Sequence, residues 1–324
     1  MSGARATLRL TFDGLRRSQI DTRWARELGG VEAYVFDGDD LVHEDQWRTL
    51  SDNLRYAFDV GARALTLHFP TENADWVGDR TAYDRLRRFC DLAADAGAQG
   101  VVLHANQFVQ LADWPAFDLA GARARVVDRI AALDAHLGDA PIWIGVENMP
   151  VIGAQGVDFD SVFVLPADFA PIAALGSDRV GVTWDVCHWA VTYSTLTAMA
   201  RLEQRPEPVA PFALPEPPVK HVHFSSFSGH AMPGWPDQCR EGVPPLAGDV
   251  PPDLLAGMLA AALDAAASAA GDGGEAGPAP GTGVVFEVQE DDYESRKNCW
   301  ETYDWLASVP GLAARVDCTR SGDA

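Results

Sequence analysis

Lysine is almost absent from this 324-residue sequence: only Lys220 and Lys297 occur, beside 23 arginines. Acidic residues number 47, so the formal net charge is −22. A strongly acidic surface keeps a protein soluble through self-repulsion, a device that halophilic proteins use. Because the charge is spread along the whole chain, we interpret it as salt adaptation rather than as one face for a cationic partner. It also argues against binding to a nucleic acid backbone.

Three further absences narrow the class of protein. No run of 18 apolar residues occurs, which argues against a transmembrane helix, and the N-terminus lacks the apolar segment of a signal peptide. The five cysteines are scattered and form no Cys-x-x-Cys pair. This pattern is typical of reduced thiols and provides neither a disulfide framework nor a structural zinc site. We therefore expect a cytoplasmic protein with no membrane partner.

Short apolar runs rich in β-forming residues alternate with longer amphipathic runs. Eight strands are predicted, at residues 7–12, 31–36, 64–69, 100–105, 141–147, 179–185, 219–224 and 283–288. Helical patterns lie between them, at 44–61, 79–97, 119–138, 166–176, 192–203, 251–271 and 293–308. Near-continuous apolar strands are typical of a parallel sheet covered by helices. The alternation predicts an α/β fold, a (β/α)8 or TIM barrel, with a doubly wound open sheet as the alternative.

Composition suggests no internal domain boundary. A proline-rich stretch at 204–218 and a Gly/Pro-rich stretch at 271–283 are interpreted as insertions, because the strand–helix alternation resumes after each. We expect one domain over residues 1–317, followed by a short C-terminal tail at 318–324.

Residues that can bind a metal stand at the ends of six consecutive predicted strands. In chain order they are His68, His104, Glu147, Asp185, His223 and Glu287. The carboxyl ends of barrel strands form one mouth, which is where barrel enzymes keep their active sites. Residues that recur once per strand–helix unit therefore become a ring around one pocket. Mixed imidazole and carboxylate donors suit Mn, Zn, Co or Mg, so a divalent metal centre is predicted.

Each of these residues taken alone has a plainer interpretation. A buried histidine is more often a satisfied core residue, and an aspartate at a strand end is more often a helix cap. Six such residues in register are hard to explain as packing. His221 lies two residues before His223 and shares its face of the strand. We prefer His223 as the metal ligand, because it lies nearer the mouth, and treat His221 as a candidate supporting residue.

Several segments resemble the xylose isomerase-like barrel superfamily, which includes sugar isomerases and epimerases and the type-IV apurinic endonucleases. They are "TLHFP" (66–70), "VVLHAN" (101–106), "IGVENMP" (144–150), "VTWDVCHWA" (182–190), "VKHVHFSS" (219–226) and "VVFEVQE" (284–290). The resemblance implies a metal held by Glu147, Asp185, His223 and Glu287. By the same resemblance, His188 contacts either the substrate or a further metal, and His68 and His104 match additional ligands of the endonucleases.

The resemblance implies two functions. The preferred one is a metal-dependent isomerase or epimerase of a sugar, sugar phosphate or related polyol, acting through an enediolate. Glu147 and Glu287 would then move the proton, and His188 would position a substrate oxygen. Asn148 and Trp184 are further candidates for contact with the sugar-like substrate. The alternative is a multi-metal phosphodiester hydrolase of the type-IV apurinic endonuclease kind.

The segment that follows the seventh predicted strand departs from both branches of the superfamily. The Asp-Arg-His triplet of the endonucleases is missing from residues 225–250, where His230 and Asp237 are the available substitutes. The arginine that the ketose epimerases carry in this region is also missing. A barrel that binds metal or sugar without catalysis is a third interpretation. The oligomeric state is left open, with a homo-oligomer as one possibility.

Overall fold

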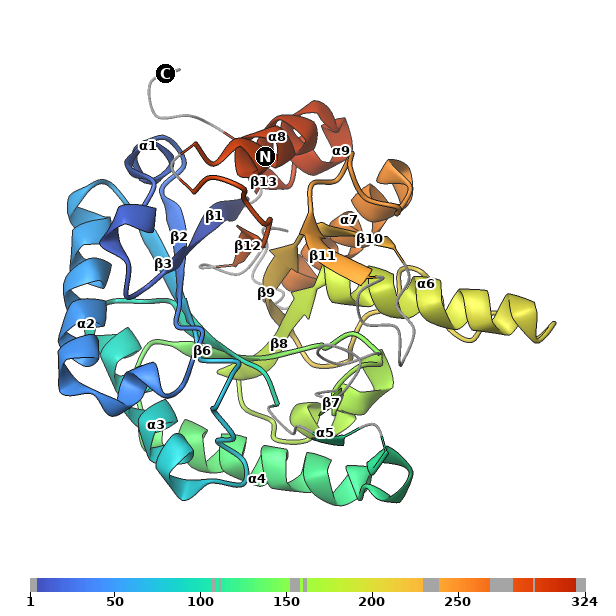
Figure 1. The fold of residues 1–324 in the computed structure, drawn as a ribbon, viewed down its shortest axis with the longest axis horizontal. Helices are drawn as coiled ribbons and strands as arrows, with labels where there is room; N and C mark the ends of the chain where they lie inside the picture. Colours follow the sequence, from blue (N-terminus) through green and yellow to red (C-terminus); the bar gives the residue numbers. More distant parts are fainter. Residues whose placement is uncertain are drawn as a thin grey trace.

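Eight parallel strands close into a barrel in the computed structural model, which describes residues 5–105, 109–110, 112–151, 158–159, 162–229, 239–268, 282–293 and 295–318. The strands are β1 (Ala6–Asp13), β2 (Gly30–Tyr34), β3 (Ala64–His68), β4 (Gly100–Leu103), β6 (Trp143–Glu147), β8 (Val180–Asp185), β9 (Val219–Phe224) and β12 (Gly283–Phe286). Pairing of β12 with β1 closes the ring (Figure 1). The predicted (β/α)8 barrel is confirmed, and the open-sheet alternative is wrong.

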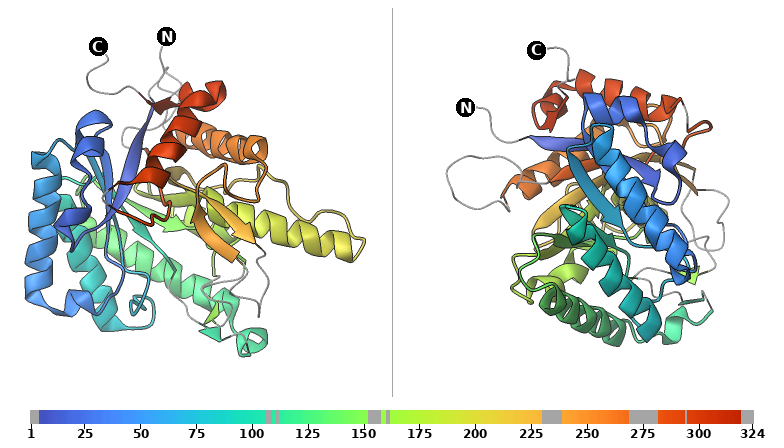
Figure 2. Two further views of the ribbon diagram at one scale, coloured as in Figure 1. Left: turned by 45° about the horizontal axis from the view of Figure 1, so that its top comes forward. Right: turned by 90° about the vertical axis from the view of Figure 1, so that its left-hand side faces the viewer.

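The helices lie outside the ring of strands (Figures 1 and 2). They are α1 (Thr22–Glu27), α2 (Glu44–Asp59), α3 (Arg80–Asp95), α4 (Leu119–Leu137), α5 (Ala170–Ala173), α6 (Val186–Leu202), α7 (Pro252–Ser268), α8 (Lys297–Ser308) and α9 (Pro310–Ala313). None of the helices in the described part of the chain combines the length and apolar character that a membrane span requires.

Five short strands lie outside the barrel wall or extend it. β5 (Val109–Gln110) pairs with β7 (Asp158–Phe159), and β10 (Ser226–Gly229) pairs with β11 (Cys239–Val243), both antiparallel. β13 (Val316–Asp317) pairs with the start of β1. The predicted tail at 318–324 lies almost wholly outside the described residues, so the domain boundary at 317 stays a prediction.

Aspartate side chains begin several of the helices. Asp21 caps α1, Asp79 caps α3, Asp118 caps α4 and Asp185 caps α6, each accepting a hydrogen bond from a backbone N–H of the first turn. Such a cap satisfies a donor that has no partner within the helix. Because Asp185 is the last residue of β8, α6 begins at Val186, six residues before the predicted start at 192. Part of the acidic excess therefore stabilises helix ends.

The inside of the barrel is unusually polar. Side chains alternate along each strand, so Leu8 and Leu10 pack outward while Arg9 between them points inward. Below the mouth the barrel encloses a polar layer whose members are at most 1 % exposed; they include Arg9, Glu32, Thr66, Thr183 and His221. Barrels are usually filled by branched apolar side chains. Here the apolar core lies between the strands and the helices instead, and the barrel interior is filled by polar side chains that need hydrogen-bond partners.

Gly283, the first residue of β12, makes room for this polar layer. A Cβ atom there would lie 2.0 Å from Nε of Arg9 and 2.7 Å from Cε1 of His221. Both neighbours are fully buried, so neither side chain can swing away into solvent. A glycine is therefore required at this position by the close approach of two side chains.

Replacement of Gly283 by alanine is expected to destabilise the protein by about 1–3 kcal/mol, the usual cost of overpacking a core. Gly311 in α9 is the matched control, because the nearest atom to its added Cβ is 4.0 Å away. Urea unfolding followed by circular dichroism measures both variants. Equal stability of Gly283→Ala and Gly311→Ala would show that the interior tolerates the added methyl group.

Candidate metal centre

The six strand-end residues meet at the mouth of the barrel. His68, Glu147 and Asp185 are the last residues of β3, β6 and β8. His104 and Glu287 lie within one residue of the ends of β4 and β12, and His223 is the last but one residue of β9. The parallel strands thus turn positions that are far apart in sequence into neighbours in space.

Four of these residues form the central group of possible metal ligands. Glu147, Asp185, His223 and Glu287 each offer a ligand atom, and these atoms all lie within 4.8 Å of one another. Nδ1 of His223 lies 3.3 Å from Oε1 of Glu147 and 3.2 Å from Oε1 of Glu287. The first three residues are buried, whereas 30 % of the Glu287 side chain is exposed. Glu287 therefore connects the buried group to the pocket above it.

The hydrogen bonding of this group fits a bound cation. Oε1 of Glu147 and both ring nitrogens of His223 are buried and make no hydrogen bond of good geometry. Nε2 of His223 lies 3.1 Å from Oε1 of Glu32, so we assign the proton of the neutral ring to Nε2. The Nδ1 lone pair then faces two carboxylates, an arrangement that repels unless a positive charge lies between them. Imidazole and carboxylate donors together suit a divalent metal ion.

His68 and His104 lie on the other side of Glu147. Their Nε2 atoms are 3.2 Å and 3.1 Å from Oε2 of Glu147. Nδ1 of His68 lies 2.8 Å from the carbonyl oxygen of Phe69, which assigns a proton to that nitrogen. His68, Glu147 and His223 form a second group of possible ligands. Glu147 thus stands between two histidine-rich sides, and the number of metals stays open.

Asn148 holds the neighbouring strand in place and does not line the pocket. Its Nδ2 donates to the carbonyl oxygen of Asp185, and its Oδ1 accepts from the backbone N–H of Asp185. Its own carbonyl oxygen lies 2.8 Å from Nδ1 of His188. The structure does not support the substrate contact expected of Asn148, because its amide is buried and hydrogen-bonded to the backbone of Asp185. Asn148 instead sets the positions of Asp185 and His188.

Trp184 also departs from the expectation. Its ring is 1 % exposed and packs against Phe169 and Trp189, in the core behind the barrel wall. Adjacent strand residues point to opposite faces, so Trp184 points outward when Asp185 points inward. The structure therefore does not support contact between Trp184 and a substrate in the barrel mouth.

The segment after β9 brings a further carboxylate to the site. In the hairpin of β10 and β11, Oε2 of Glu241 lies 3.8 Å from Nε2 of His188. His188 lines the pocket, as its predicted role requires. Nothing in the spacing around Glu241 singled it out, because the hairpin follows no strand–helix period. His230 and Asp237, the proposed substitutes for missing ligands, lie outside the described residues.

Glu32 is the second acidic residue that sequence analysis missed. It lies in the middle of β2, is fully buried, and accepts a hydrogen bond of 2.7 Å from Oγ1 of Thr66. Oε2 of Glu32 lies 3.0 Å from Nε2 of His221. Burial lowers the pKa of His221 to about 4, against the opposing effect of Glu32, so His221 is neutral at pH 7. The available signal was a single charge inside the apolar run "GVEAYVF".

The buried carboxylates and histidines shift each other's pKa values. Burial raises the pKa of Asp185 to about 7; His188 opposes this rise, and Glu147 and Glu287 add to it. Burial lowers the pKa of His223, but Glu287, Glu147 and Glu32 raise it well above its usual value. Burial likewise lowers the pKa of His188, but Asp185 and the surrounding glutamates raise it to about 10. Protons and a metal ion therefore compete to neutralise the same negative charge.

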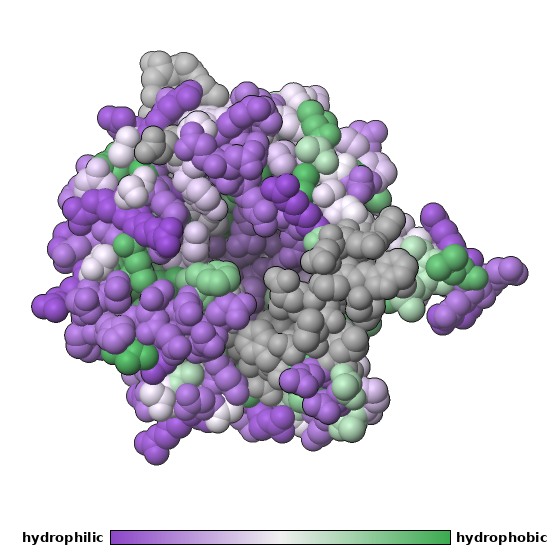
Figure 3. All heavy atoms as spheres, in the orientation of Figure 1, coloured by the Kyte–Doolittle hydropathy of each residue, from purple (hydrophilic) through white to green (hydrophobic). Residues whose placement is uncertain are grey.

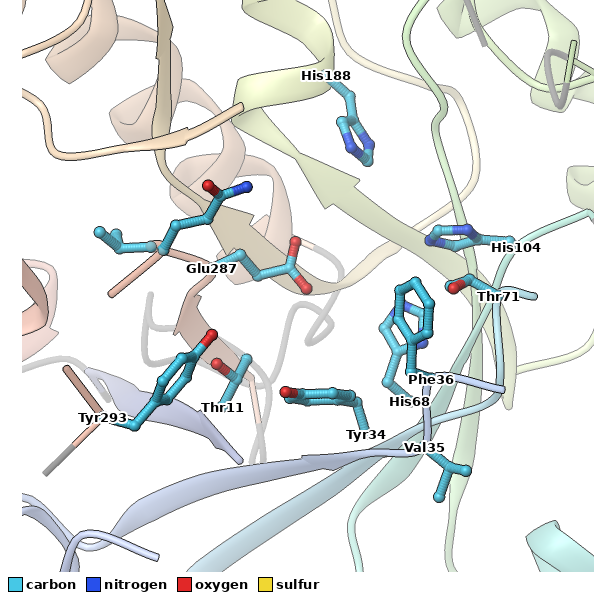
Figure 4. Close-up of a pocket in the computed structure, with 12 residues that line it drawn as sticks. Thr11, Tyr34, Val35, Phe36, His68, Thr71, His104, His188, Glu287 and Tyr293 are labelled. Carbon is cyan, nitrogen blue, oxygen red and sulfur yellow. The ribbon is translucent and has the colours of Figure 1, made fainter. Parts of the chain in front are cut away.

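A pocket opens above the metal group. It is lined by Thr11, Tyr34, Val35, Phe36, His68, Thr71, His104, His188, Glu287, Val288, Gln289 and Tyr293. In Figure 4 the carboxylate of Glu287 points into the space between His188, His104 and Tyr34. Figure 3 shows the hollow from outside, with hydrophilic residues along its upper side. Burial raises the pKa of Tyr34 to about 12, so its phenol stays protonated and can donate a hydrogen bond.

Fold and site together define the class: a (β/α)8 barrel with a group of carboxylates and histidines at its mouth that can hold a metal ion. The chain belongs to the xylose isomerase-like TIM barrel family, whose pattern matches residues 23–262. The resemblance noted in the sequence is thereby confirmed. A search of curated proteins found no significant sequence match.

Structures with the same fold come from several sugar epimerases. A D-tagatose 3-epimerase-like protein is 15 % identical, with a TM-score of 0.56 over 92 % of this chain and 96 % of that chain. A 3-keto-D-glucoside 4-epimerase from E. coli is 14 % identical, with a TM-score of 0.56 over 92 % and 99 %. A xylose isomerase domain protein from Planctomyces limnophilus is 12 % identical, with a TM-score of 0.52 over 94 % and 96 %. At these identities the likeness is one of fold.

Removing a ligand from the central group is expected to weaken metal binding. Glu147→Gln and Asp185→Asn should each lower Mn²⁺ or Co²⁺ affinity by more than the roughly 10–100-fold that loss of an outer contact costs. Glu241→Gln is the control, because Glu241 lies near His188 but outside the ligand group. Equilibrium dialysis with metal analysis measures all three. Full metal content in both ligand variants would contradict this metal centre.

Metal affinity is also expected to rise with pH. Asp185, with a pKa of about 7, must lose its proton to bind the metal, and His223, whose pKa is raised as well, must do the same. Below pH 7 each such proton lowers the apparent affinity by up to about tenfold per pH unit. Isothermal titration with Mn²⁺ at pH 6 and pH 8 tests this sign. An equal or tighter dissociation constant at pH 6 would contradict it.

Proposed function

We propose that this protein is a metal-dependent isomerase or epimerase of a sugar or related polyol, acting through an enediolate. The observation that carries the proposal is the group of Glu147, Asp185, His223 and Glu287 beneath an open pocket. A divalent ion held there acidifies a C–H next to a carbonyl and stabilises the negative charge that develops on oxygen. Mn, Zn, Co and Mg all suit these donors. The fold is shared with known sugar epimerases, which supports the same conclusion.

Glu287 is best placed to take a proton from the substrate. It lines the pocket, and His223 holds its pKa below the usual value although burial opposes this. It is therefore ionised near neutral pH and can act as a general base. Glu147, across the group, is the second carboxylate that the return of a proton requires. His188 has Nδ1 against the carbonyl oxygen of Asn148, which leaves Nε2 to meet a substrate oxygen.

The lining of the pocket favours a sugar without phosphate groups. None of the described residues that line it is lysine or arginine, while Glu287 contributes negative charge. A phosphate would enter this environment without a lysine or arginine to bind it. Tyr34, Phe36 and Tyr293 offer aromatic faces, and Thr11, Thr71 and Gln289 offer hydrogen bonds. This combination suits a neutral molecule that has both apolar faces and hydroxyl groups.

One observation favours the alternative of a phosphodiester hydrolase. His68 and His104 both approach Oε2 of Glu147, so donors for a second metal lie beside the central group. The lack of lysine and arginine among the described lining residues counts against it, because phosphodiester binding relies on basic residues. We therefore keep hydrolysis as the outcome that the test must exclude.

The proposal predicts turnover of free sugars. The purified protein, loaded with Mn²⁺ in molar salt, should interconvert members of a panel of ketoses and aldoses, with solvent deuterium incorporated at the reacting carbon. Glu287→Gln should lower kcat by about 10²–10⁴-fold, because a positioned general base contributes that much. Chromatography and proton NMR of the products measure both effects.

Two controls accompany this experiment. Glu203→Gln, on the exposed end of α6, should leave turnover unchanged. The same preparation is offered sugar phosphates and DNA that contains an abasic site. Cleavage of that DNA without turnover of any sugar would replace isomerisation by hydrolysis as the function.

A further inference from the structure

Glu32 lies directly beneath the proposed metal centre and takes no part in it as a ligand. It comes from the middle of β2, across the barrel from β9, and its Oε1 is 3.1 Å from Nε2 of His223. The opposite ring nitrogen, Nδ1, faces Glu147 and Glu287 at 3.3 Å and 3.2 Å. One imidazole thus separates the buried carboxylate from the carboxylates of the metal group. Both Glu32 and His223 are fully buried.

The second oxygen of Glu32 is held by two other groups. Oγ1 of Thr66 donates to Oε2 over 2.7 Å, and Nε2 of His221 approaches the same oxygen at 3.0 Å. The hydroxyl of Thr66 also accepts from Nη1 of Arg9, which carries positive charge into this layer. Burying a carboxylate is costly unless it is paired and hydrogen-bonded. The contacts around Oε2 therefore fix the carboxylate so that Oε1 is presented to His223.

We propose that Glu32 is a positioning residue of the metal centre: it keeps the proton of His223 on Nε2, leaves the Nδ1 lone pair for the metal, and is itself held by His221. A metal-bound histidine needs an acceptor for its other N–H, since that contact sets the tautomer and the ring orientation. In this chain the group that faces Nε2 is the carboxylate of Glu32, with Oε1 at 3.1 Å. The inference rests on the metal centre of the proposed function and not on the sugar chemistry.

Glu32, His221 and His223 also lie close enough together to form a metal site of their own. Two features favour the positioning role instead. The carboxylate of Glu32 meets the two histidines through different oxygens, at hydrogen-bond distances, and Oε2 already accepts from Thr66. Arg9 adds a positive charge to the same layer, which opposes a second cation.

Cobalt binding tests the proposal, because Co²⁺ reports affinity and ligand geometry through its visible absorption. Glu32→Gln keeps the shape of the side chain but removes its charge, and is expected to weaken Co²⁺ binding by about 10–100-fold and to change the spectrum. His221→Phe should cause a smaller loss. Because His221 acts through Glu32, the double variant should bind Co²⁺ no more weakly than Glu32→Gln alone.

Thr183→Val is the matched control. Thr183 is buried beside His221 on the neighbouring strand, and its hydroxyl has no hydrogen-bond partner, so this variant should match the wild type. Wild-type affinity and spectrum in Glu32→Gln would overturn the inference alone. Additive losses of Co²⁺ affinity in the double variant would also overturn it. So would the loss of one bound Co²⁺ equivalent while a second bound equivalent stays unchanged. A wild-type protein that binds no Co²⁺ would overturn the metal centre and this inference together.

Circular dichroism establishes whether each variant folds. If Glu32→Gln does not fold, Thr66→Val takes its place, because it removes one donor to Oε2 while keeping the carboxylate. Thr66→Val should then weaken Co²⁺ binding several-fold and shift the spectrum in the same direction as the charge-removing change would. Unchanged Co²⁺ binding in a folded Thr66→Val would overturn the inference.

Discussion

Four carboxylates share the interior of one barrel, and the need to balance their charge shapes everything around them. Glu32, Glu147, Asp185 and Glu287 all lie in or just above the ring of strands. An ionised carboxylate taken out of water costs several kcal/mol, roughly, unless it is paired. Five histidines and Arg9 provide the partners that the structure shows. A divalent ion is the most compact addition that offsets several carboxylates at once.

The parallel barrel explains why so much of this arrangement was accessible from sequence. Each strand delivers its last residue to the same mouth, so a donor that recurs once per strand–helix unit has to meet the others there. His68, Glu147 and Asp185 end their strands as the pattern indicates. The fold followed from the alternation of strands and helices, the family from the resemblance of the strand-end segments, and both are confirmed. The roles of these residues in metal binding stay predictions, because spacing brings donors together without saying what they hold.

The periodic pattern of the sequence could not predict features that depend on contacts across the barrel. Glu32 lies in the middle of β2, and the sequence alone does not show that His221 and His223 lie beside it. Asn148 was expected to contact the substrate, yet its amide is hydrogen-bonded to the next strand. Glu241 reaches the site through a hairpin that belongs to no repeat. Each of these cases depends on a contact between segments distant in sequence.

Asp185 connects the metal group to the wall of the pocket. Its Oδ1 accepts from the backbone N–H of His188 and so begins α6, while the residue also belongs to the group of possible metal ligands. The helix-cap and metal-ligand interpretations are thus compatible, because a carboxylate has two oxygens. Asn148 fastens the same two residues from the neighbouring strand. A shift of Asp185 on metal binding would therefore be transmitted to His188, so the residue proposed to meet the substrate is positioned by a residue proposed to hold the metal.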